Sequence, residues 1–371
     1  MKFSLCATKL VQPRLNLEAF FHRKDKVVFV MGATGTGKSR LAIDLATRFP
    51  AEIVNSDKIQ IYKGLDILTN KVTEEECRGV PHHLLGIVDP NSNFTSMDFQ
   101  HRASLAVESI HAEGRLPIVA GGSNSYIEAL VNNDPEFQLR CECCFLWIDV
   151  SLPVLHSFVS QRVDKMVRAG LVEEAAQIFD PLADYSRGIR RAIGVPELDQ
   201  YFRGGSTVDA KIRARMLNKA ISKIKENTCT LASRQIQKIL RLYNQWNWKM
   251  HRIDATEVFL KRGEEADEAW ERLVAGRSTL IVDQFLCEKN HAPTILPSAA
   301  SSSVPIAVAV AAASQFNGLK VGEVNASIEL LVNCVHSKTV QMVAFQKSMQ
   351  TAPALIIIQN TIFCGSKQLF I

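Results

Sequence analysis

Apolar runs that alternate with helical patterns divide the first half of the chain into short strands and helices. Residues 26–31 read KVVFVM, a β-branched and aromatic run typical of a strand buried on both faces. Further apolar runs cover residues 52–56 and 116–120, and another begins at Phe145. After the first run, apolar residues recur at helical spacing at Leu41, Ala42, Leu45, Ala46 and Phe49. This alternation predicts an α/β fold with a mostly parallel sheet and helices on both faces.

The glycine-rich segment after residues 26–31 has the spacing of a phosphate-binding loop (P-loop). It reads GxxxxGK[ST] and consists of Gly32, Ala33, Thr34, Gly35, Thr36, Gly37, Lys38 and Ser39. A strand before it and a helix after it are the context in which this motif binds phosphate. Its N–H groups then converge at the positive end of a helix dipole, Lys38 adds a charge, and Ser39 offers a hydroxyl to Mg²⁺. The motif predicts a phosphate or diphosphate ligand with Mg²⁺; the alternative is a glycine-rich turn without a ligand.

The pattern predicts a P-loop NTPase-like core and a smaller helical region. Residues 208–246 read as one helical segment with nine Lys and Arg against two acidic residues, which is also the pattern of a solvated basic face. Residues 292–315 carry no charge and are rich in Ala, Ser and Pro. We therefore expect a leader over 1–24, the P-loop core over 25–151, a helical region that covers the substrates over 152–254, a C-terminal helix completing the core over 255–290, and a low-complexity linker and tail without assigned role over 291–371.

Composition and charge limit the classes of protein to which this chain can belong. The chain has 371 residues, of which 47% are hydrophobic and 22% charged, as in ordinary globular proteins. The net charge of +5 favours anionic ligands but is too small to indicate a nucleic-acid partner. The longest apolar run, 305–313, is too short to cross a bilayer, so no membrane partner is expected. Nine cysteines without a paired framework favour a reducing compartment, and Cys141 and Cys144 lack the second pair that a zinc site needs.

Asp57 follows the run at 52–56, so we expect it at the carboxyl end of the sheet beside the P-loop. The run 116–120 ends in Gly121, Gly122, Ser123 and Asn124 rather than in a metal-binding carboxylate. Small hydroxyl and amide side chains after two glycines suggest a close-packed floor for a planar or sugar group. These features argue against the kinase or ATPase that a P-loop alone suggests. By spacing alone, Asp57 could equally be a helix N-cap or hold Mg²⁺ through water.

Several motifs in fixed order resemble the isopentenyltransferase (dimethylallyltransferase) family. They lie between about residues 24 and 270 and include GATGTGKSRLAIDLA, NSDKIQIYKGLDILTNK, GVPHHLLG, AGGSNSYIEALV, GIRRAIGVPELDQYF and IKENTCTLASRQIQKILRLYNQW. Within the family, the sequence is similar to the plant branch that prenylates free adenylates at the start of cytokinin synthesis. The eukaryotic tRNA-modifying branch usually carries a C-terminal C2H2 zinc finger, and no such Cys/His spacing follows Trp246. The resemblance therefore implies dimethylallyl diphosphate as donor and ADP or ATP, with AMP an open alternative, as acceptor.

The resemblance also implies roles for single residues. Asp57 matches the carboxylate that takes a proton from the adenine N6 amine, and Lys38 with the loop amides would stabilise the departing diphosphate. Arg234 matches the Arg of a family x-R-Q motif and should reach the diphosphate. Ser233 beside it replaces a Lys found in many relatives, so a positive charge there is not required. Thr34 matches a position near the reacting centre.

Other candidates are less specific. Gln60, Ser123 and Asn124 are expected to recognise the acceptor, because neutral amide and hydroxyl groups can pair with a base edge or ribose; turn chemistry is the alternative for Ser123 and Asn124. Arg162, in a family R-x-x-x-M motif, could border the prenyl pocket or cap a helix. Three lysines are candidates for the nucleotide's phosphates, Lys219, Lys223 and Lys225.

Two other functions remain possible, and the sequence also bears on the cellular location. The alternatives to prenyl transfer onto free nucleotides are prenyl transfer to a tRNA adenine and a P-loop regulatory module without catalysis. Residues 1–26 are basic and poor in acidic residues, as in an organelle transit peptide, although a short extension has the same composition. Because the resembled plant enzymes are often plastidial, we expect a plastid location, with the cytoplasm as the alternative.

Overall fold

A six-stranded parallel sheet forms the centre of the computed structural model, which describes residues 24–205, 209–246, 248–288, 355–358 and 361–364. The strands are β1 (Asp25–Gly32), β2 (Ala51–Asn55), β3 (His82–His83), β4 (Leu116–Ala120), β5 (Cys141–Asp149) and β6 (Met250–Asp254). They lie in the order β3-β2-β4-β1-β5-β6, and every pairing is parallel. The predicted α/β fold with a parallel sheet is therefore confirmed.

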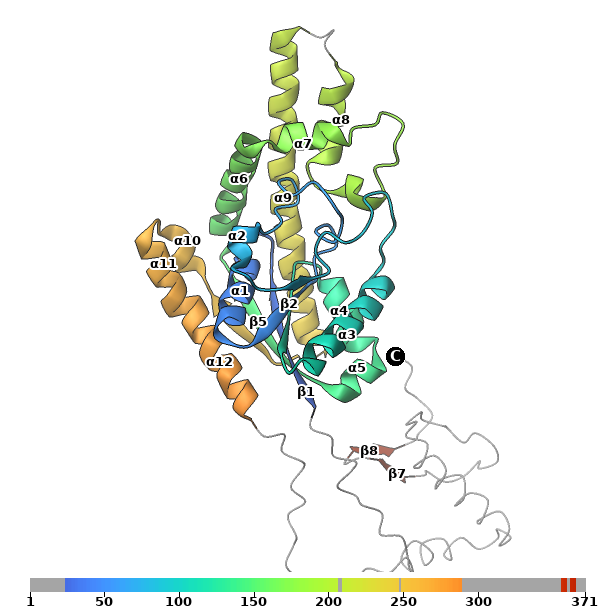
Figure 1. Ribbon diagram of the computed structural model, residues 1–371, viewed down its shortest axis with the longest axis vertical. Coiled ribbons are helices and arrows are strands. Elements are labelled where there is room, and N and C mark those ends of the chain that lie inside the picture. The colour runs from blue at the N-terminus through green and yellow to red at the C-terminus, as the bar shows by residue number, and fades with distance from the viewer. Residues whose placement is uncertain (1–23, 206–208, 247, 289–354, 359–360, 365–371) are drawn as a thin grey trace, which may run out of the picture. The chain divides into compact units, whose positions relative to one another are not determined.

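Helices cover both faces of this sheet because side chains along β1 alternate between two buried clusters. Val27, Phe29 and Met31 pack with α3 (Ser96–Ala112), α4 (Asn124–Asn132), α5 (Pro135–Arg140) and the C-terminal half of α9 (Ala210–Trp246). Val28 and Val30 pack with α1 (Lys38–Arg48), α11 (Glu264–Trp270), η3 (Glu271–Ala275) and α12 (Gly276–Cys287). Figure 1 shows both helical layers beside the central strands. The four central strands, β2, β4, β1 and β5, are thus buried between helices, as their apolar sequences require, whereas the edge strands β3 and β6 are partly exposed.

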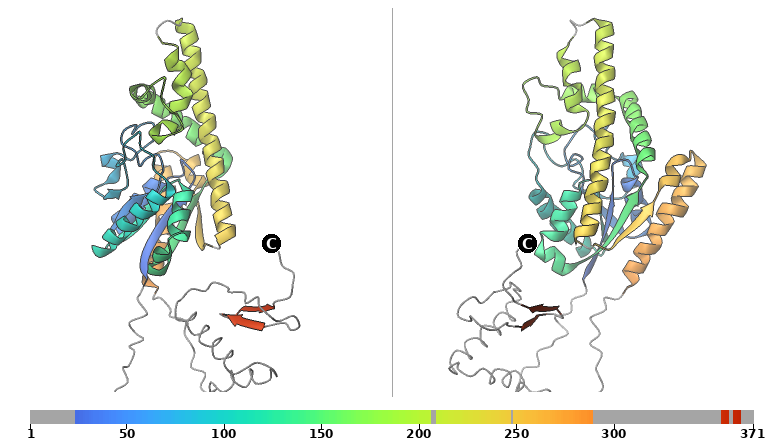
Figure 2. Two further views of the ribbon diagram at one scale, coloured as in Figure 1. Left: turned by 90° about the vertical axis from the view of Figure 1, so that its right-hand side faces the viewer. Right: turned by 180° about the vertical axis from the view of Figure 1, so that it is seen from behind.

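The helical region rises beyond the carboxyl ends of the strands. It contains α6 (Leu152–Ala169), α7 (Leu171–Gln177), η2 (Gly188–Arg191), α8 (Val195–Arg203) and the N-terminal half of α9. Both views in Figure 2 show α9 running from the tip of this region down along the sheet. One 37-residue helix therefore connects the helical region to the core. Among the described residues, no helix combines the length and apolarity that a membrane span needs.

The boundaries differ from the expected ones in two places. Residues 250–254, expected in the helical region, form the edge strand β6 and pair with Phe145–Asp149 of β5. Instead of one C-terminal helix, α10 (Thr256–Leu260) is followed by α11, η3 and α12, of which η3 is a π-helical turn. Sequence periodicity did not reveal β6 because Met250–Asp254 is short and carries exposed polar residues at an edge.

The chain divides into two compact units, Met1–Thr294 and Ile295–Ile371. In the second unit, β7 (Leu355–Ile358) and β8 (Thr361–Cys364) form an antiparallel pair. The predicted leader and the rest of the predicted linker and tail lie outside the described residues.

Candidate active site

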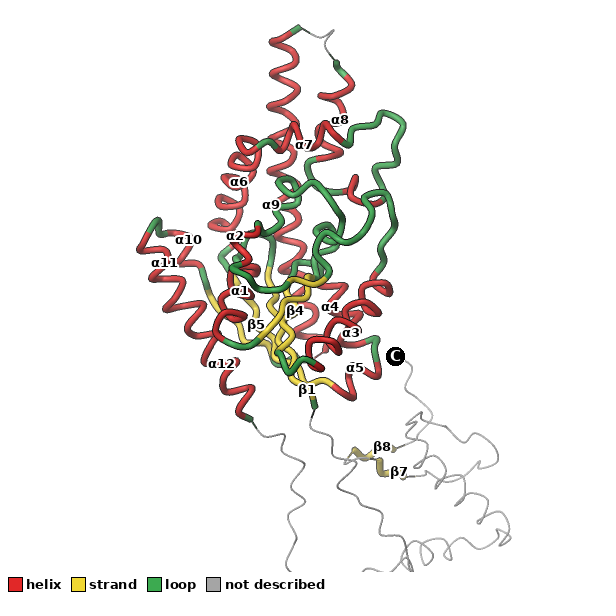
Figure 3. Tube along the Cα trace, viewed as in Figure 1, coloured by secondary structure: helices red, strands yellow, loops and turns green. Residues whose placement is uncertain are grey.

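A cavity of about 1740 Å³ lies at the carboxyl end of the sheet, beneath the helical region. Figure 3 shows the loops, in green, gathered between the strand ends and helices α6 to α8. The cavity wall contains both predicted halves of the site: Lys38 and Ser39 of the P-loop, and Asp57 and Gln60 after β2. The structure therefore brings the P-loop and the strand-end carboxylate to one space.

The P-loop is held between two helices by its glycines. Gly35 and Gly37 have φ angles of +85° and +91°, which favour glycine. A Cβ atom at Gly35 would lie 2.6 Å from the Val159 side chain of α6. A Cβ atom at Gly37 would lie 2.6 Å from the ring of Trp270 in α11. Any side chain at either position would push the loop away from the helix that supports it.

Lys38 is one of the charged groups that line the cavity. Its Nζ atom donates to the Ala33 carbonyl at 2.7 Å. Burial lowers the pKa of Lys38 to about 8, while the Asp57 carboxylate raises it and the Arg162 guanidinium lowers it. These three charged groups are therefore close enough to affect one another, although they come from different segments of the chain.

Backbone hydrogen bonds fix the position of the Asp57 carboxylate. Its Oδ1 atom accepts from the Ile59 N–H at 2.9 Å, and the Asn55 side chain accepts from the Asp57 N–H at 3.2 Å. Among the described residues, Oδ2 has no hydrogen-bond donor, and a Cβ atom at Gly122 would lie 3.3 Å from it. One carboxylate oxygen is thus held by the protein, and the other remains available to accept a proton.

Gly121 and Gly122, expected in the floor of a site, line the cavity and also pack closely on the segment that holds Asp57. A Cβ atom at Gly121 would lie 2.4 Å from the carbonyl carbon of Ser56, so only glycine lets β4 approach the backbone before Asp57 this closely. Ser123 adds to this contact by accepting a hydrogen bond from the Lys58 N–H at 2.8 Å. The Gly-Gly-Ser segment therefore positions the Asp57 turn.

Arg162, which the sequence left undecided, lies at the P-loop. Its Nη2 atom donates to the Thr34 hydroxyl at 2.9 Å, and its Nε atom is buried with no hydrogen-bond partner among the described residues. Burial lowers the pKa of Arg162, and the Asp57 carboxylate partly offsets this effect. A buried guanidinium with an unused donor beside a phosphate-binding loop is suited to bind an anion.

Arg234 takes a different position from the expected one. Its side chain is exposed and is absent from the described residues that line the cavity. The next residue of α9, Gln235, contacts the P-loop in its place. The side chain of Ser233 instead donates to the Cys229 carbonyl of the same helix at 3.1 Å.

The three candidates for acceptor recognition also separate. Gln60 lines the cavity, but its amide nitrogen donates to the carbonyls of Thr69 and Asn70 at 3.1 and 2.9 Å. Ser123 and Asn124 are buried, at 8% and 2% exposure, and are not among the described cavity-lining residues. For Ser123 the structure therefore contains a contact within the turn, the hydrogen bond from the Lys58 N–H, which is the alternative that the sequence left open.

The remaining basic candidates lie on the N-terminal half of α9. Lys223 and Lys225 form ion pairs with Glu226 and Asp164 at 2.9 and 2.7 Å. Lys219 is exposed. None of the three is among the described residues that line the cavity.

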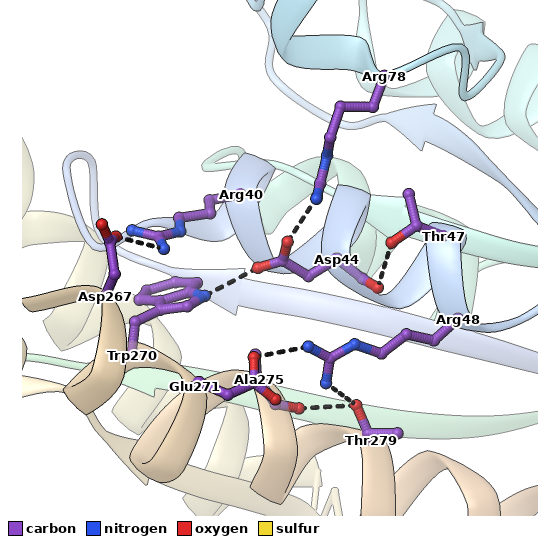
Figure 4. A network of polar contacts seen from close by, with 10 residues as sticks. All are labelled: Arg40, Asp44, Thr47, Arg48, Arg78, Asp267, Trp270, Glu271, Ala275 and Thr279. Atoms are coloured by element: carbon purple, nitrogen blue, oxygen red, sulfur yellow. Dashed lines mark hydrogen bonds and ion pairs between the residues drawn. The ribbon is translucent and has the colours of Figure 1, made fainter. Parts of the chain in front are cut away.

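A network of polar contacts holds the C-terminal helices against the P-loop helix (Figure 4). The Trp270 indole N–H donates to the Asp44 carboxylate of α1 at 2.8 Å, and the other oxygen of that carboxylate pairs with Arg78. Arg48 of α1 pairs with Glu271 at 2.6 Å. Trp270 therefore both packs on Gly37 and is anchored to the helix that follows the P-loop, a support that no sequence motif indicated.

The residues present fit a magnesium ion bound mainly through substrate. Ser39 is exposed at the cavity wall, where its hydroxyl can serve as a ligand. Among the described residues, no group of three or more His, Cys, Asp or Glu side chains could hold a metal. Mg²⁺ characteristically takes one or two protein ligands together with substrate phosphate oxygens, which is what Ser39 and a bound diphosphate would provide.

Comparison with known proteins shows extensive similarity to one group of enzymes. The family model described as IPP transferase matches residues 60–140 and 132–239. Adenylate isopentenyltransferase 5, chloroplastic, from Arabidopsis thaliana is 66% identical, over 80% of this chain and 92% of its own. Adenylate isopentenyltransferase 7, mitochondrial, from the same plant is 59% identical, over 78% and 92%. Adenylate isopentenyltransferase from Humulus lupulus is 44% identical, over 70% and 90%.

Solved structures share the fold. A eukaryotic dimethylallyltransferase acting on tRNA has a TM-score of 0.61 at 24% identity and covers 71% of this chain and 80% of its own. A tRNA isopentenylpyrophosphate transferase from Bacillus halodurans has a TM-score of 0.57 at 25% identity, over 71% and 99%. The identities with the plant proteins are far higher and extend over nearly their whole length. With the P-loop and Asp57 facing one cavity, the chain belongs to the adenylate isopentenyltransferase family, which are prenyltransferases.

Proposed function

We propose that this protein transfers the dimethylallyl group of dimethylallyl diphosphate to the N6 amine of ADP or ATP, the first step of cytokinin synthesis. The observation that carries the proposal is the meeting of Asp57 and the P-loop Lys38 at one cavity, where the carboxylate is close enough to raise the lysine pKa. The plant relatives, named for adenylate as acceptor, support this choice.

The adenine amine is a poor nucleophile because its lone pair is delocalised into the ring. In the proposed reaction, N6 attacks C1 of the donor, the C1–O bond breaks, and pyrophosphate leaves with the bonding electron pair. Asp57 Oδ2, which has no donor among the described residues, accepts the proton that N6 loses. A positioned general base typically contributes about 10²- to 10⁴-fold in rate.

Charge that develops on the leaving pyrophosphate requires donors that are already in place. Lys38, the P-loop amides and the buried Nε atom of Arg162 are the candidates from this chain. Mg²⁺ on Ser39 would neutralise part of the same charge when bound. Arg234, exposed on α9, has a place in this proposal only if it moves toward the cavity when substrate binds.

The other cavity walls suit a prenyl chain and a nucleotide. Apolar side chains of α6 and the following segments face the cavity, among them Val154, Phe158, Met166 and Phe259. Lys58, Lys165 and Arg191 line it as well and can attract nucleotide phosphates. A covered cavity keeps water from the reacting allylic carbon, which would otherwise be converted to an alcohol. The net charge of +5 favours a free nucleotide over RNA.

The names of the relatives and the leader sequence support a proposal for the location. Several are named chloroplastic and one mitochondrial. We propose the plastid for this protein, because its basic leader resembles a transit peptide. A fluorescent fusion of the full chain should enter plastids, and a fusion without residues 1–24 should not; a cytoplasmic full-length fusion would contradict the proposal.

The acceptor is tested directly with purified protein, dimethylallyl diphosphate and Mg²⁺. AMP, ADP, ATP and unmodified tRNA are supplied in separate reactions, and N6-prenylated product is measured by mass spectrometry. We expect product with ADP and ATP. Product on tRNA alone would establish the tRNA-modifying alternative, and the absence of product on every acceptor would favour the regulatory module.

A further inference from the structure

Gln235 of α9 connects the two halves of the site through one side-chain amide. Its Oε1 atom accepts from the Thr34 N–H of the P-loop at 2.7 Å. Its Nε2 atom donates to the Gly122 carbonyl, in the segment after β4, at 2.8 Å. The Thr34 N–H requires an acceptor and the Gly122 carbonyl requires a donor, so the amide has only one orientation that satisfies both.

Gly122 lies between this amide and the catalytic carboxylate. A Cβ atom at Gly122 would lie 2.6 Å from Gln235 Nε2 and 3.3 Å from Asp57 Oδ2. The neighbouring Gly121 packs on the backbone that leads into Asp57. A shift of the segment after β4 would therefore displace Asp57, and a shift of the P-loop would displace the pyrophosphate.

The backbone of α9 at Gln235 is fixed as well. The Asn124 side chain donates to the Gln235 carbonyl at 3.1 Å. Asn124, expected at the sequence level to contact the acceptor, thus holds the helix at the position from which Gln235 reaches across. The contacts run from α4 through α9 to the P-loop, and all join segments distant in sequence.

We infer that Gln235 is a positioning residue that sets the distance between the base Asp57 and the pyrophosphate cradle. This inference rests on the proposed function. It assigns Gln235 no contact with substrate, since its amide bonds to the P-loop and to Gly122 and the residue is not among the described residues that line the cavity. The amide should therefore affect the chemical step more than the binding of pyrophosphate, because misplacement of reacting groups by about 1 Å can cost about 100-fold in rate.

Two variants and one control test this role. Gln235→Met keeps the length of the side chain and removes both hydrogen bonds. Gln235→Glu keeps the bond from Thr34, but its carboxylate repels the Gly122 carbonyl until it is protonated. Gln237→Met is the matched control, because Gln237 is exposed on the same helix.

Single-turnover rates, pyrophosphate Kd and thermal unfolding are measured for each protein. For Gln235→Met we expect the rate to fall at least tenfold, with the Kd within about threefold and Gln237→Met unchanged. For Gln235→Glu we expect the rate, relative to wild type, to recover as pH falls toward 5, because the protonated acid can donate to Gly122. A structural role alone would not produce this recovery.

A rate within twofold of wild type for Gln235→Met, or a Gln235→Glu rate ratio that does not change with pH, would overturn the inference. If Gln235→Met fails to fold, the pH dependence of Gln235→Glu decides. Wild-type protein is assayed first: if it transfers no prenyl group to any acceptor, the proposed function fails and the inference falls with it. An active wild type with unaffected variants refutes only the role of Gln235.

Discussion

Lys38 should make anion binding depend on pH in a range that is easily measured. Burial lowers its pKa to about 8, which places its loss of charge between pH 7 and pH 9. Only the protonated ammonium attracts a pyrophosphate oxygen. With this pKa, roughly nine-tenths of Lys38 is charged at pH 7 and roughly one-tenth at pH 9. The affinity for pyrophosphate should therefore fall about tenfold over this range through Lys38 alone.

The measurement is calorimetric titration with pyrophosphate, without Mg²⁺, at pH 7, 8 and 9. Lys38→Arg is the control, since its guanidinium stays charged throughout. Pyrophosphate itself loses a proton in this range, so the informative quantity is the ratio of the Kd values of the two proteins at each pH. This ratio, wild type over Lys38→Arg, should rise about tenfold from pH 7 to pH 9. A constant ratio would show that Lys38 does not titrate at this pH or does not contact the anion.

Two further substitutions test the surroundings of the P-loop. Arg162→Gln removes a charge that lowers the Lys38 pKa, so Lys38 should lose its charge at a higher pH in the same titration. The variant should also bind pyrophosphate more weakly at pH 7. An unchanged pH dependence would show that Arg162 does not affect the Lys38 pKa. Trp270→Phe loses the 2.8 Å bond to Asp44 and the outer ring atoms that pack on Gly37. The lost hydrogen bond alone should lower the free energy of unfolding, measured in urea titrations, by about 1.5–3 kcal/mol. The Trp246 N–H lies 3.4 Å from Glu128 on the surface, so Trp246→Phe should lower the free energy of unfolding less. Equal decreases for the two variants would contradict the reasoning.

Strands β1, β2 and β4 were predictable because they are short, mostly apolar runs with distinct boundaries, whereas β5, expected from Phe145, begins at Cys141, and the two-residue β3 carries no apolar run. β4 matches the predicted residues 116–120, and β1 and β2 differ by one residue at their ends. β6 was missed because an edge strand buries only part of its side chains, and its apolar run is too short to show a period. The division of the C-terminal segment into α10 to α12 depends on packing against α1, which no local pattern expresses.

The site was predictable where a motif fixes backbone geometry and less so where tertiary contacts decide. The P-loop and Asp57 follow from strand ends and glycines, and they meet at the cavity. The sequence favoured Arg234 as the guanidinium at the diphosphate, because the resemblance placed it in a family motif, but the structure places Arg162 at the P-loop. Which of the two arginine side chains faces the P-loop depends on how α6 and α9 pack against the core. Helical phase does not settle the position of Arg234, since Leu231, three residues before it on α9, lines the cavity.

The central claim is that Asp57 removes the N6 proton while the P-loop holds the departing pyrophosphate. Asp57→Asn keeps the shape of the side chain and can no longer act as a base. The most direct test compares, in this variant and in wild type, the rate of prenyl transfer to ADP in a single turnover. We predict a fall of about 10²- to 10⁴-fold, with pyrophosphate still bound. A variant that retains most of the wild-type rate would contradict the account.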